Sequence, residues 1–501
     1  MTAAAGPVLR ADAVVIGSGA GGAPAAARLA EAGFEVLVLE AGPRVETPDF
    51  EPDEAAMTAR LGRTTATASG AQNLYAGACV GGSTVVNDAL CWRTPSEVLE
   101  RWRREHGLSD LTDAAFAPFV EFVWEAIHAE PTPRSHLNRN AHRLELGARR
   151  LGWSGEAMAR NVRGCARLGR CNWGCPTGAK QSALVGYLPR AERAGARVLA
   201  GTQATRVRVS AGAVAGVEAV QRGASDEAPV TALRVEAPLV LLAAGVLETP
   251  ALLLRSGLTG GGAVGRGLQF HSSVIAAARF AEPVHGYFGP TMSWAVTEFS
   301  DVNGHAGPGF MLENTAVHPL VTATSLPGFG AEHQRAMQAL PHLARAVVVL
   351  RDQTRGRVTI DSEGRARYEH ALDAPDLERM RRAQRELARA YLAADALEVF
   401  LPVHGLAPIR GEADLAQLAA APLDPTRFSF LYAVHLFGGA CLGGSREAGA
   451  CRPDGELWDV RGLYVADGSA LPSNTGVNPQ VTIAANALRI ASALAERGPR
   501  A

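Results

Sequence analysis

A glycine run that follows a short apolar segment constrains the fold of this chain more than any other feature. The run is Gly17–Gly22, after residues 12–16, which read as a buried strand. Residues 23–31 then read as an alanine-rich helix and residues 35–39 as a second strand, which ends at Glu40. Strand, helix and strand form one βαβ unit whose two strands are predicted to be parallel.

This βαβ unit predicts a dinucleotide-binding site. Its glycines allow a tight turn and let a pyrophosphate approach the N-terminus of the helix. Glu40 lies at the spacing expected of a carboxylate that binds a ribose hydroxyl. The residues predicted to contact the cofactor here are Gly17, Gly19, Gly22 and Glu40.

Composition and charge restrict the class of protein. The chain has 501 residues, a formal net charge of −1, 47% hydrophobic and 20% charged residues, so it has no basic field for nucleic acid. Its apolar runs, such as 238–244, are shorter than the ~20 residues that span a bilayer. Residues 1–10 lack a basic region followed by an apolar core, so we expect a cytoplasmic location, with export alongside a signal-bearing partner left open.

Further segments predicted to reach the cofactor lie far apart in the chain. Residues 77–83 form a second glycine-rich turn, which reads either as an ordinary turn or as a loop whose amides approach a large cofactor. Residues 198–220 alternate apolar and polar side chains, which is typical of a small antiparallel meander. Residues 239–244 and 463–467 read as two more buried strands.

This distribution predicts an α/β fold with two interleaved domains. The first is a Rossmann-like, cofactor-binding domain made of residues 1–264 and 430–501, with a cysteine loop, 164–182, inserted in it. The second is an α+β, substrate-binding domain made of residues 265–429.

The cysteine loop contains three of the seven cysteines, Cys165, Cys171 and Cys175. Their spacing does not fit one helix face, but a tight loop could bring the three thiols to one inorganic centre, and cluster-binding runs of ferredoxins also end in Cys-Pro. The odd cysteine count favours a reducing compartment over a disulfide framework. A structural zinc site and free thiols are the alternatives. Lys180, the only lysine, lies in the same loop, which indicates a local role.

Together these motifs resemble the glucose-methanol-choline (GMC) family of flavoprotein oxidoreductases. The resemblance rests on 14–22 with Glu40, on Gly81-Gly-Ser83 with Asn87, on Ala243-Ala-Gly245, and above all on 462–487, which resembles the flavin-contacting end of cholesterol oxidases. It implies that the cofactor is FAD rather than NAD. The remaining residues assigned to FAD are Gly81, Gly82, Ser83, Asn87, Val207, Ala244, Asp467, Gly468, Pro479 and Gln480.

The resemblance also implies the catalytic pair His435 and Asn478, on opposite sides of the substrate near flavin N5. A neutral imidazole can take the hydroxyl proton of an alcohol while the flavin accepts the hydride, and an amide can hold the substrate oxygen. A satisfied core histidine is the alternative for His435. The other histidines considered show no ligand-like spacing and are expected to be ordinary: His271, His285, His305, His318 and His404.

The cysteine loop resembles the cluster-binding segment of bacterial FAD-dependent glucose dehydrogenases. The resemblance implies that Cys165, Cys171 and Cys175 ligate a 3Fe-4S cluster, or a 4Fe-4S cluster with an outside ligand. We therefore predict an FAD-dependent alcohol dehydrogenase that passes electrons through the cluster to a cytochrome or another acceptor protein, and whose partners can include a small, chaperone-like subunit. The alternatives are an oxygen-dependent alcohol or sterol oxidase whose cysteine loop is structural, and a non-redox flavoprotein lyase.

Overall fold

The computed structural model describes residues 7–223 and 230–499, and its first layer is a five-stranded parallel sheet. The strand order is β10 (Arg197–Leu199), β3 (Val36–Leu39), β2 (Ala13–Ile16), β14 (Leu239–Leu242) and β24 (Leu463–Val465). Every residue of β2, β3, β14 and β24 is buried. Strands covered on both faces have continuous apolar runs, so the sequence prediction for these four strands is confirmed.

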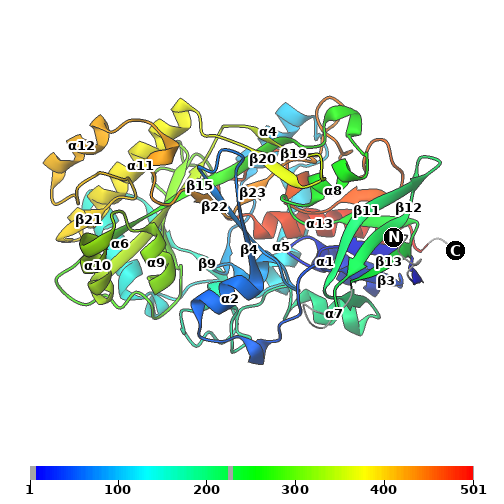
Figure 1. The fold of residues 1–501 in the computed structure, drawn as a ribbon, viewed down its shortest axis with the longest axis horizontal. Coiled ribbons are helices and arrows are strands. Elements are labelled where there is room, and N and C mark those ends of the chain that lie inside the picture. The colour runs from blue at the N-terminus through cyan, green and yellow to red at the C-terminus, as the bar shows by residue number, and fades with distance from the viewer. Residues whose placement is uncertain (1–6, 224–229, 500–501) are drawn as a thin grey trace.

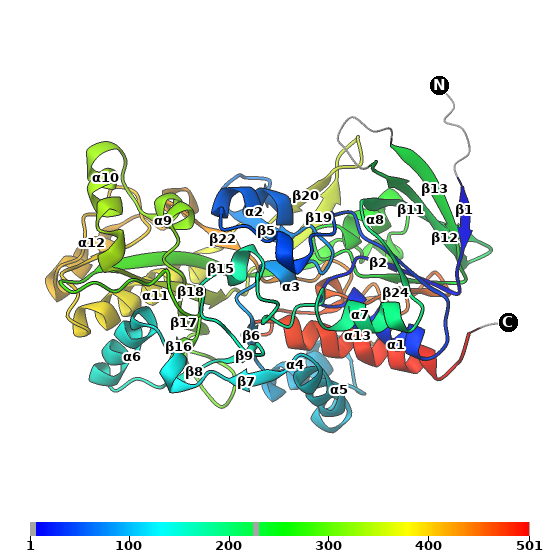
Figure 2. The same cartoon turned by 90° about the horizontal axis from the view of Figure 1, so that it is seen from below.

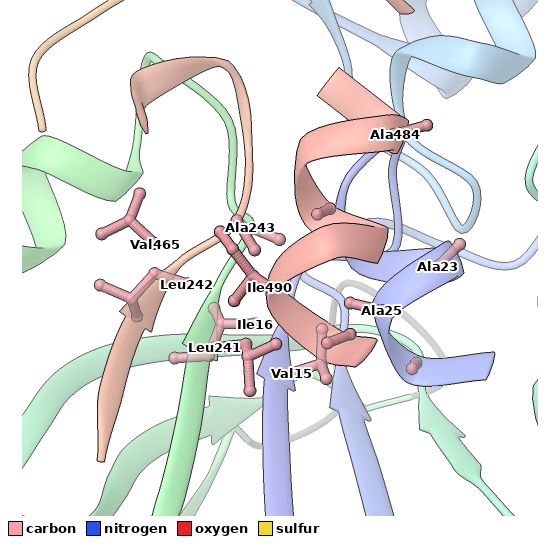
Figure 3. Packing of buried hydrophobic residues seen from close by; sticks show 14 of the residues in the cluster. Val15, Ile16, Ala23, Ala25, Leu241, Leu242, Ala243, Val465, Ala484 and Ile490 are labelled. Atoms are coloured by element: carbon pink, nitrogen blue, oxygen red, sulfur yellow. The ribbon is translucent and has the colours of Figure 1, made fainter. Parts of the chain in front are cut away.

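Two helices from opposite ends of the chain cover one face of this sheet. They are α1 (Gly22–Glu31) and α13 (Gln480–Ala495), which lie side by side in blue and red in Figure 1. Figure 3 shows Ile490 of α13 and Ala25 of α1 packed over Val15 and Leu241 of the strands. Small side chains on α1 permit this close approach, and burial of such apolar surface stabilises the fold by roughly 25 cal/mol per Å².

A second, four-stranded sheet contacts the first through β12 and β14. Its order is β1 (Val8–Arg10), β13 (Thr231–Glu236), β12 (Ala213–Gln221) and β11 (Thr202–Ser210). β11 and β12 are antiparallel neighbours, as the alternating pattern of 198–220 predicts, and β13, which lies beyond that range, adds a third antiparallel strand.

The far half of the molecule contains a twelve-stranded sheet built around the long strand β15 (Arg266–Arg279). α6 (Arg139–Leu151) and α11 (Ala374–Ala393) pack on each other and on this sheet, at the end opposite α1 and α13 (Figures 1 and 2). The other strands are β4 (Gly62–Ala66), β5 (Asn73–Gly77), β8 (Gly155–Ala157), β16 (Trp294–Val296), β17 (Phe310–Asn314), β18 (Leu343–Arg351), β19 (Gly356–Ile360), β20 (Ala366–Glu369), β21 (Glu398–Phe400), β22 (Tyr432–Ala433) and β23 (Leu436–Phe437).

The remaining elements are shorter and connect these layers. A three-stranded sheet consists of β6 (Leu90–Cys91), β7 (Ala129–Pro131) and β9 (Ala159–Asn161). The other helices are α2 (Glu54–Leu61), α3 (Ser83–Val86), α4 (Ser96–His106), α5 (Asp113–Ala126), α7 (Tyr187–Arg193), α8 (Thr249–Arg255), α9 (Pro319–Ser325), α10 (Gly330–Gln338) and α12 (Leu415–Ala420).

The chain passes between the two halves several times. β15 begins one residue after the predicted boundary at 265, yet β4, β5, β8 and β22, which lie outside 265–429 in the sequence, also join its sheet. The Rossmann-like and substrate-binding parts are therefore interleaved, in the α/β class that the sequence predicts. Within 7–223 and 230–499, no helix has both the length and the apolar character needed to cross a membrane.

Candidate active site

The loop between β2 and α1 forms one wall of a cavity. Gly17 has a φ of +97°, and a Cβ there would lie 2.2 Å from the carbonyl oxygen of Ala243. A Cβ on Gly22, the first residue of α1, would lie 1.9 Å from the carbonyl oxygen of Gly17. Because side chains are excluded from both positions, the N-terminus of α1 can lie close to a bound anion, as dinucleotide sites require.

Glu40 follows β3 and connects two loops of this wall. Its Oε2 accepts hydrogen bonds from the Ser18 N–H at 3.0 Å and the Ser18 hydroxyl at 2.6 Å, and Oε1 accepts from the Gly42 N–H at 2.9 Å. Burial raises the pKa of Glu40, and these hydrogen bonds act in the opposite direction. The Ser18 hydroxyl oxygen also accepts from the N–H of Gly81, which fixes the second glycine loop against the first.

The second glycine loop and α13 meet in the lining of the cavity. Ser83 Oγ accepts a hydrogen bond from the Gly77 N–H at 2.9 Å. Asn87 Nδ2 donates to Gln480 Oε1 at 2.9 Å, which ties this loop to the first residue of α13. Two segments separated by almost 400 residues are therefore held together at the site by side-chain amides.

Asp467 performs a similar function after β24. Its Oδ2 accepts from the Gly245 N–H at 2.8 Å and from the Thr249 hydroxyl at 2.6 Å, and its Oδ1 accepts from the Ser469 N–H at 2.8 Å. Burial raises the pKa of Asp467 against these hydrogen bonds. This carboxylate orders the ends of β14 and β24 where both border the cavity.

All these loops line one cavity of about 690 Å³. The sequence-predicted residues that line it are Gly17, Gly19, Glu40, Gly82, Ser83, Asn87, Ala244, His435, Asp467, Gly468, Asn478, Pro479 and Gln480. Glycine backbone, a helix N-terminus and the Glu40 carboxyl together fit a dinucleotide cofactor.

Three predicted cofactor residues do not line the cavity. Gly22 and Gly81 pack behind the two loops, where they permit the close contacts described above. Val207 lies further along β11, outside this lining, and its N–H donates to Ser256 Oγ at 2.9 Å. The part of β11 that lines the cavity is 202–204.

His435 and Asn478 lie together at the other end of the cavity. His435 follows β22, Asn478 precedes α13, and His435 Nε2 lies 3.4 Å from Asn478 Nδ2. Asn478 Oδ1 has no hydrogen-bond partner among the described residues. Burial lowers the pKa of His435 to about 4, so its imidazole is neutral near neutral pH.

Two residues that sequence reasoning missed complete this end of the cavity. His271 of β15 was expected to be ordinary, yet its Nδ1 lies 3.1 Å from His435 Nδ1. Glu313 of β17 is completely buried on the cavity wall, and neither of its carboxyl oxygens has a hydrogen-bond partner among the described residues. Burial raises the pKa of Glu313 to about 8, against a lowering effect of Asn478, while Asp88 raises it further.

Comparison with known proteins identifies the family. Two models of GMC oxidoreductases, for the N-terminal and C-terminal parts of the family, match residues 15–273 and 352–487. The chain belongs to the GMC oxidoreductases. It is therefore an oxidoreductase of the class that acts on CH–OH groups, and the resemblance found in the sequence is confirmed.

Relatives of this GMC oxidoreductase match it over nearly its whole length. An uncharacterized GMC-type oxidoreductase of Mycobacterium tuberculosis is 35% identical over 97% of this chain and 76% of the relative. A long-chain-alcohol oxidase of Arabidopsis thaliana is 30% identical over 97% of this chain and 68% of its own. The crystal structure of pyridoxine 4-oxidase from Mesorbium loti has the same fold, with a TM-score of 0.71, 19% identity, and coverage of 97% and 98% of the two chains.

The cysteine loop of this GMC oxidoreductase has an arrangement that the sequence did not predict. Arg160 Nη2 donates to Cys171 Sγ at 3.0 Å, and its Nη1 lies 4.0 Å from Cys165 Sγ. Cys175 Sγ instead accepts from the Lys180 N–H at 3.5 Å. Among the described residues, no group of three histidine, cysteine or acidic side chains is arranged to hold a metal ion. The structure therefore gives no support for a cluster that all three thiols ligate, and the cluster stays a prediction from the sequence.

Lys180 does have the local role that its position indicates. Its buried Nζ donates to the carbonyl oxygens of Val85 at 2.6 Å, Asn87 at 2.9 Å and Cys171 at 2.6 Å. Burial lowers its pKa to about 8. The ammonium thereby fastens the cysteine loop to the segment that carries Asn87 into the cavity.

Proposed function

We propose that this GMC oxidoreductase binds FAD and oxidises an alcohol at the His435–Asn478 end of the cavity. One observation carries the proposal: a single cavity contains both the dinucleotide-binding loops and this polar pair. The first glycine loop, Glu40 and the second glycine loop would hold the cofactor. Bound FAD supplies the acceptor for the hydride that leaves the carbinol carbon.

The residues of the chain then bind and orient the alcohol. His435 and Asn478 come from facing segments, so both can contact the substrate oxygen. The wall beyond them is mostly apolar and excludes water from the reacting carbon. Its apolar members include Ile275, Met292, Val347, Val349 and Leu320. This lining favours an alcohol with an apolar body over a free sugar.

The electron acceptor is a separate part of the proposal. The named relatives, a long-chain-alcohol oxidase and pyridoxine 4-oxidase, support oxygen as the acceptor. The arrangement of Arg160 and Lys180 around the cysteine loop supports a structural role for that loop. The dehydrogenase with a 3Fe-4S cluster, a small subunit and a cytochrome stays a prediction from the sequence, and no step of the proposal uses the cluster.

The test combines two assays on the purified flavoprotein. Under nitrogen, a panel of primary and secondary alcohols is mixed with the enzyme, and we expect at least one to bleach the flavin absorbance. In air, the same alcohol should yield hydrogen peroxide. If no alcohol of the panel bleaches the flavin, the proposed reaction is wrong, and the lyase hypothesis gains support.

The site assignment has its own control pair. His435→Ala should lower the anaerobic rate of flavin reduction by roughly 100-fold or more, the usual contribution of a positioned catalytic side chain. His404→Ala, which removes an exposed histidine, should leave the rate unchanged. Equal rates for His435→Ala and the unmodified enzyme would remove His435 from the mechanism.

A further inference from the structure

The pairing of β15 with the segment around β22 and β23 brings two histidines together. Ser273 of β15 is in register with Tyr432, and Phe270 is in register with Leu436. Between these pairs, the His271 N–H donates to the carbonyl oxygen of His435 at 3.1 Å. The side chains meet as well: the two Nδ1 atoms lie 3.1 Å apart, with the rings 87° from coplanar.

The other ring nitrogen of His271, Nε2, faces a backbone N–H, which can donate a hydrogen bond but cannot accept one. The backbone N–H of Gly476 points at His271 Nε2 from 3.1 Å. A backbone N–H only donates, so His271 Nε2 must accept and carries no proton. His271 is also neutral, because burial and the neighbouring His435 hold its pKa well below the ordinary range. A neutral imidazole has one N–H, so the proton of His271 is on Nδ1.

The same reasoning extends to His435. The Nδ1–H of His271 donates to His435 Nδ1, which therefore accepts and carries no proton. The single proton of neutral His435 is then on Nε2, the nitrogen next to Asn478. The amide of Asn478 can accommodate this proton by a rotation that exchanges Oδ1 and Nδ2, whereas the Gly476 N–H cannot turn.

We propose that His271 is a positioning residue. The Gly476 N–H fixes the tautomer of His271, and the Nδ1–H of His271 in turn fixes the tautomer of His435. His435 then presents an N–H, not a lone pair, to the substrate oxygen. The statement about the substrate oxygen rests on the proposed function, but the tautomer of His435 does not.

This inference changes the role that the resemblance implies for His435. To accept the hydroxyl proton at Nε2, His435 would need its own proton on Nδ1. His271 would then carry its proton on Nε2, directly opposite the Gly476 N–H. That arrangement sets two donors against each other, so in the resting enzyme His435 holds the substrate oxygen as a hydrogen-bond donor.

The tautomer can be read directly by nitrogen NMR of the holoenzyme labelled with ¹⁵N-histidine. The His435 signals are assigned by their loss in His435→Gln. In the unmodified protein we expect a protonated Nε2 and an unprotonated Nδ1 for His435. A protonated Nδ1 would overturn the proposal.

Three variants separate positioning from general structure. His271→Leu removes the donor, and His435 should shift wholly or partly to the Nδ1–H form. His271→Asn can keep a donor near the Nδ1 position and an acceptor for the Gly476 N–H, and should retain Nε2–H. His370→Leu removes another buried imidazole, which packs on Phe270, and should leave the signals unchanged.

Flavin content and urea unfolding show which variants are folded. Among folded variants, an unchanged Nε2–H form in His271→Leu would also overturn the proposal. The alcohol assay adds a second readout: His271→Leu should lower kcat at least tenfold, with partial recovery in His271→Asn. If no alcohol is oxidised, the proposed function fails while the NMR result still decides the tautomer.

Discussion

Replacing Glu313 by glutamine should remove a large pH dependence of stability. The carboxyl is completely buried, neither oxygen has a hydrogen-bond partner among the described residues, and its pKa is raised to about 8. Because the folded value lies above the ordinary value of 4.5, the folded protein binds this proton more tightly than the unfolded chain does. The stabilisation is thus complete below the unfolded pKa and is lost as the pH rises through about 8.

The magnitude follows from these two pKa values. At about 1.4 kcal/mol per pH unit, their difference corresponds to about 5 kcal/mol of unfolding free energy in total. About 3 to 4 kcal/mol of this falls between about pH 5 and about pH 8. Glutamine has nearly the same shape and does not titrate, so the unfolding free energy of Glu313→Gln should not contain this pH-dependent loss.

The assay is urea unfolding of the FAD-loaded protein at several pH values, with the unfolding free energy compared between the unmodified protein and Glu313→Gln. The difference between them should grow in favour of the variant by about 3 to 4 kcal/mol from about pH 5 to about pH 8. Glu332→Gln, at an exposed position on α10, should run parallel to the unmodified protein. A parallel curve for Glu313→Gln would show that folding does not raise the pKa of Glu313 and would refute the reasoning.

Further predictions concern the cofactor loops and the cysteine loop. Gly22→Ala should abolish FAD retention, measured as flavin absorbance per protein, because its Cβ would lie 1.9 Å from the Gly17 carbonyl oxygen. Glu40→Ala should weaken FAD binding at least tenfold in a fluorescence titration, since it frees the Ser18 and Gly42 donors and removes the carboxylate proposed to accept from the ribose. Lys180→Met should destabilise the fold by about 3 kcal/mol in urea unfolding, because three buried carbonyl oxygens lose a charged donor. If the cysteine loop is structural, as proposed, iron analysis of anaerobically purified protein should find no stoichiometric iron; about three irons per flavin would support the cluster prediction instead.

The sequence predicts the Rossmann-like part well because its signals are local. The turn from Gly17 to Gly22, the strand before it and Glu40 lie within 30 residues, and each has a backbone or hydrogen-bonding reason that the structure reproduces. The last strand and α13 are equally local. Val207 shows the limit of this reasoning. Which residues of β11 line the cavity depends on how the strand is placed in its sheet, and the spacing of residues in the sequence does not reveal this.

The reacting end could be predicted only in part, because strand pairing over long distances assembles it. His271 and His435 are 164 residues apart, and only the register of β15 makes them neighbours. Glu313 lies in the run Phe-Met-Leu-Glu-Asn, which reads as an ordinary strand with a polar end. Its burial in the cavity wall depends on the pairing of β17 with β16 and β18. For the cysteine loop, spacing alone did not reveal that Arg160, which precedes the loop, would reach two of its sulfur atoms.

The single lysine has a practical consequence for labelling this protein. Amine-reactive dyes and crosslinkers usually modify many surface lysines. Here the single ε-amino group, that of Lys180, is buried and donates to three carbonyl oxygens. Any reagent that reaches it must first separate the cysteine loop from the segment around Asn87. The rate at which a dye modifies Lys180 therefore measures how often this region opens, and no other lysine contributes to the signal.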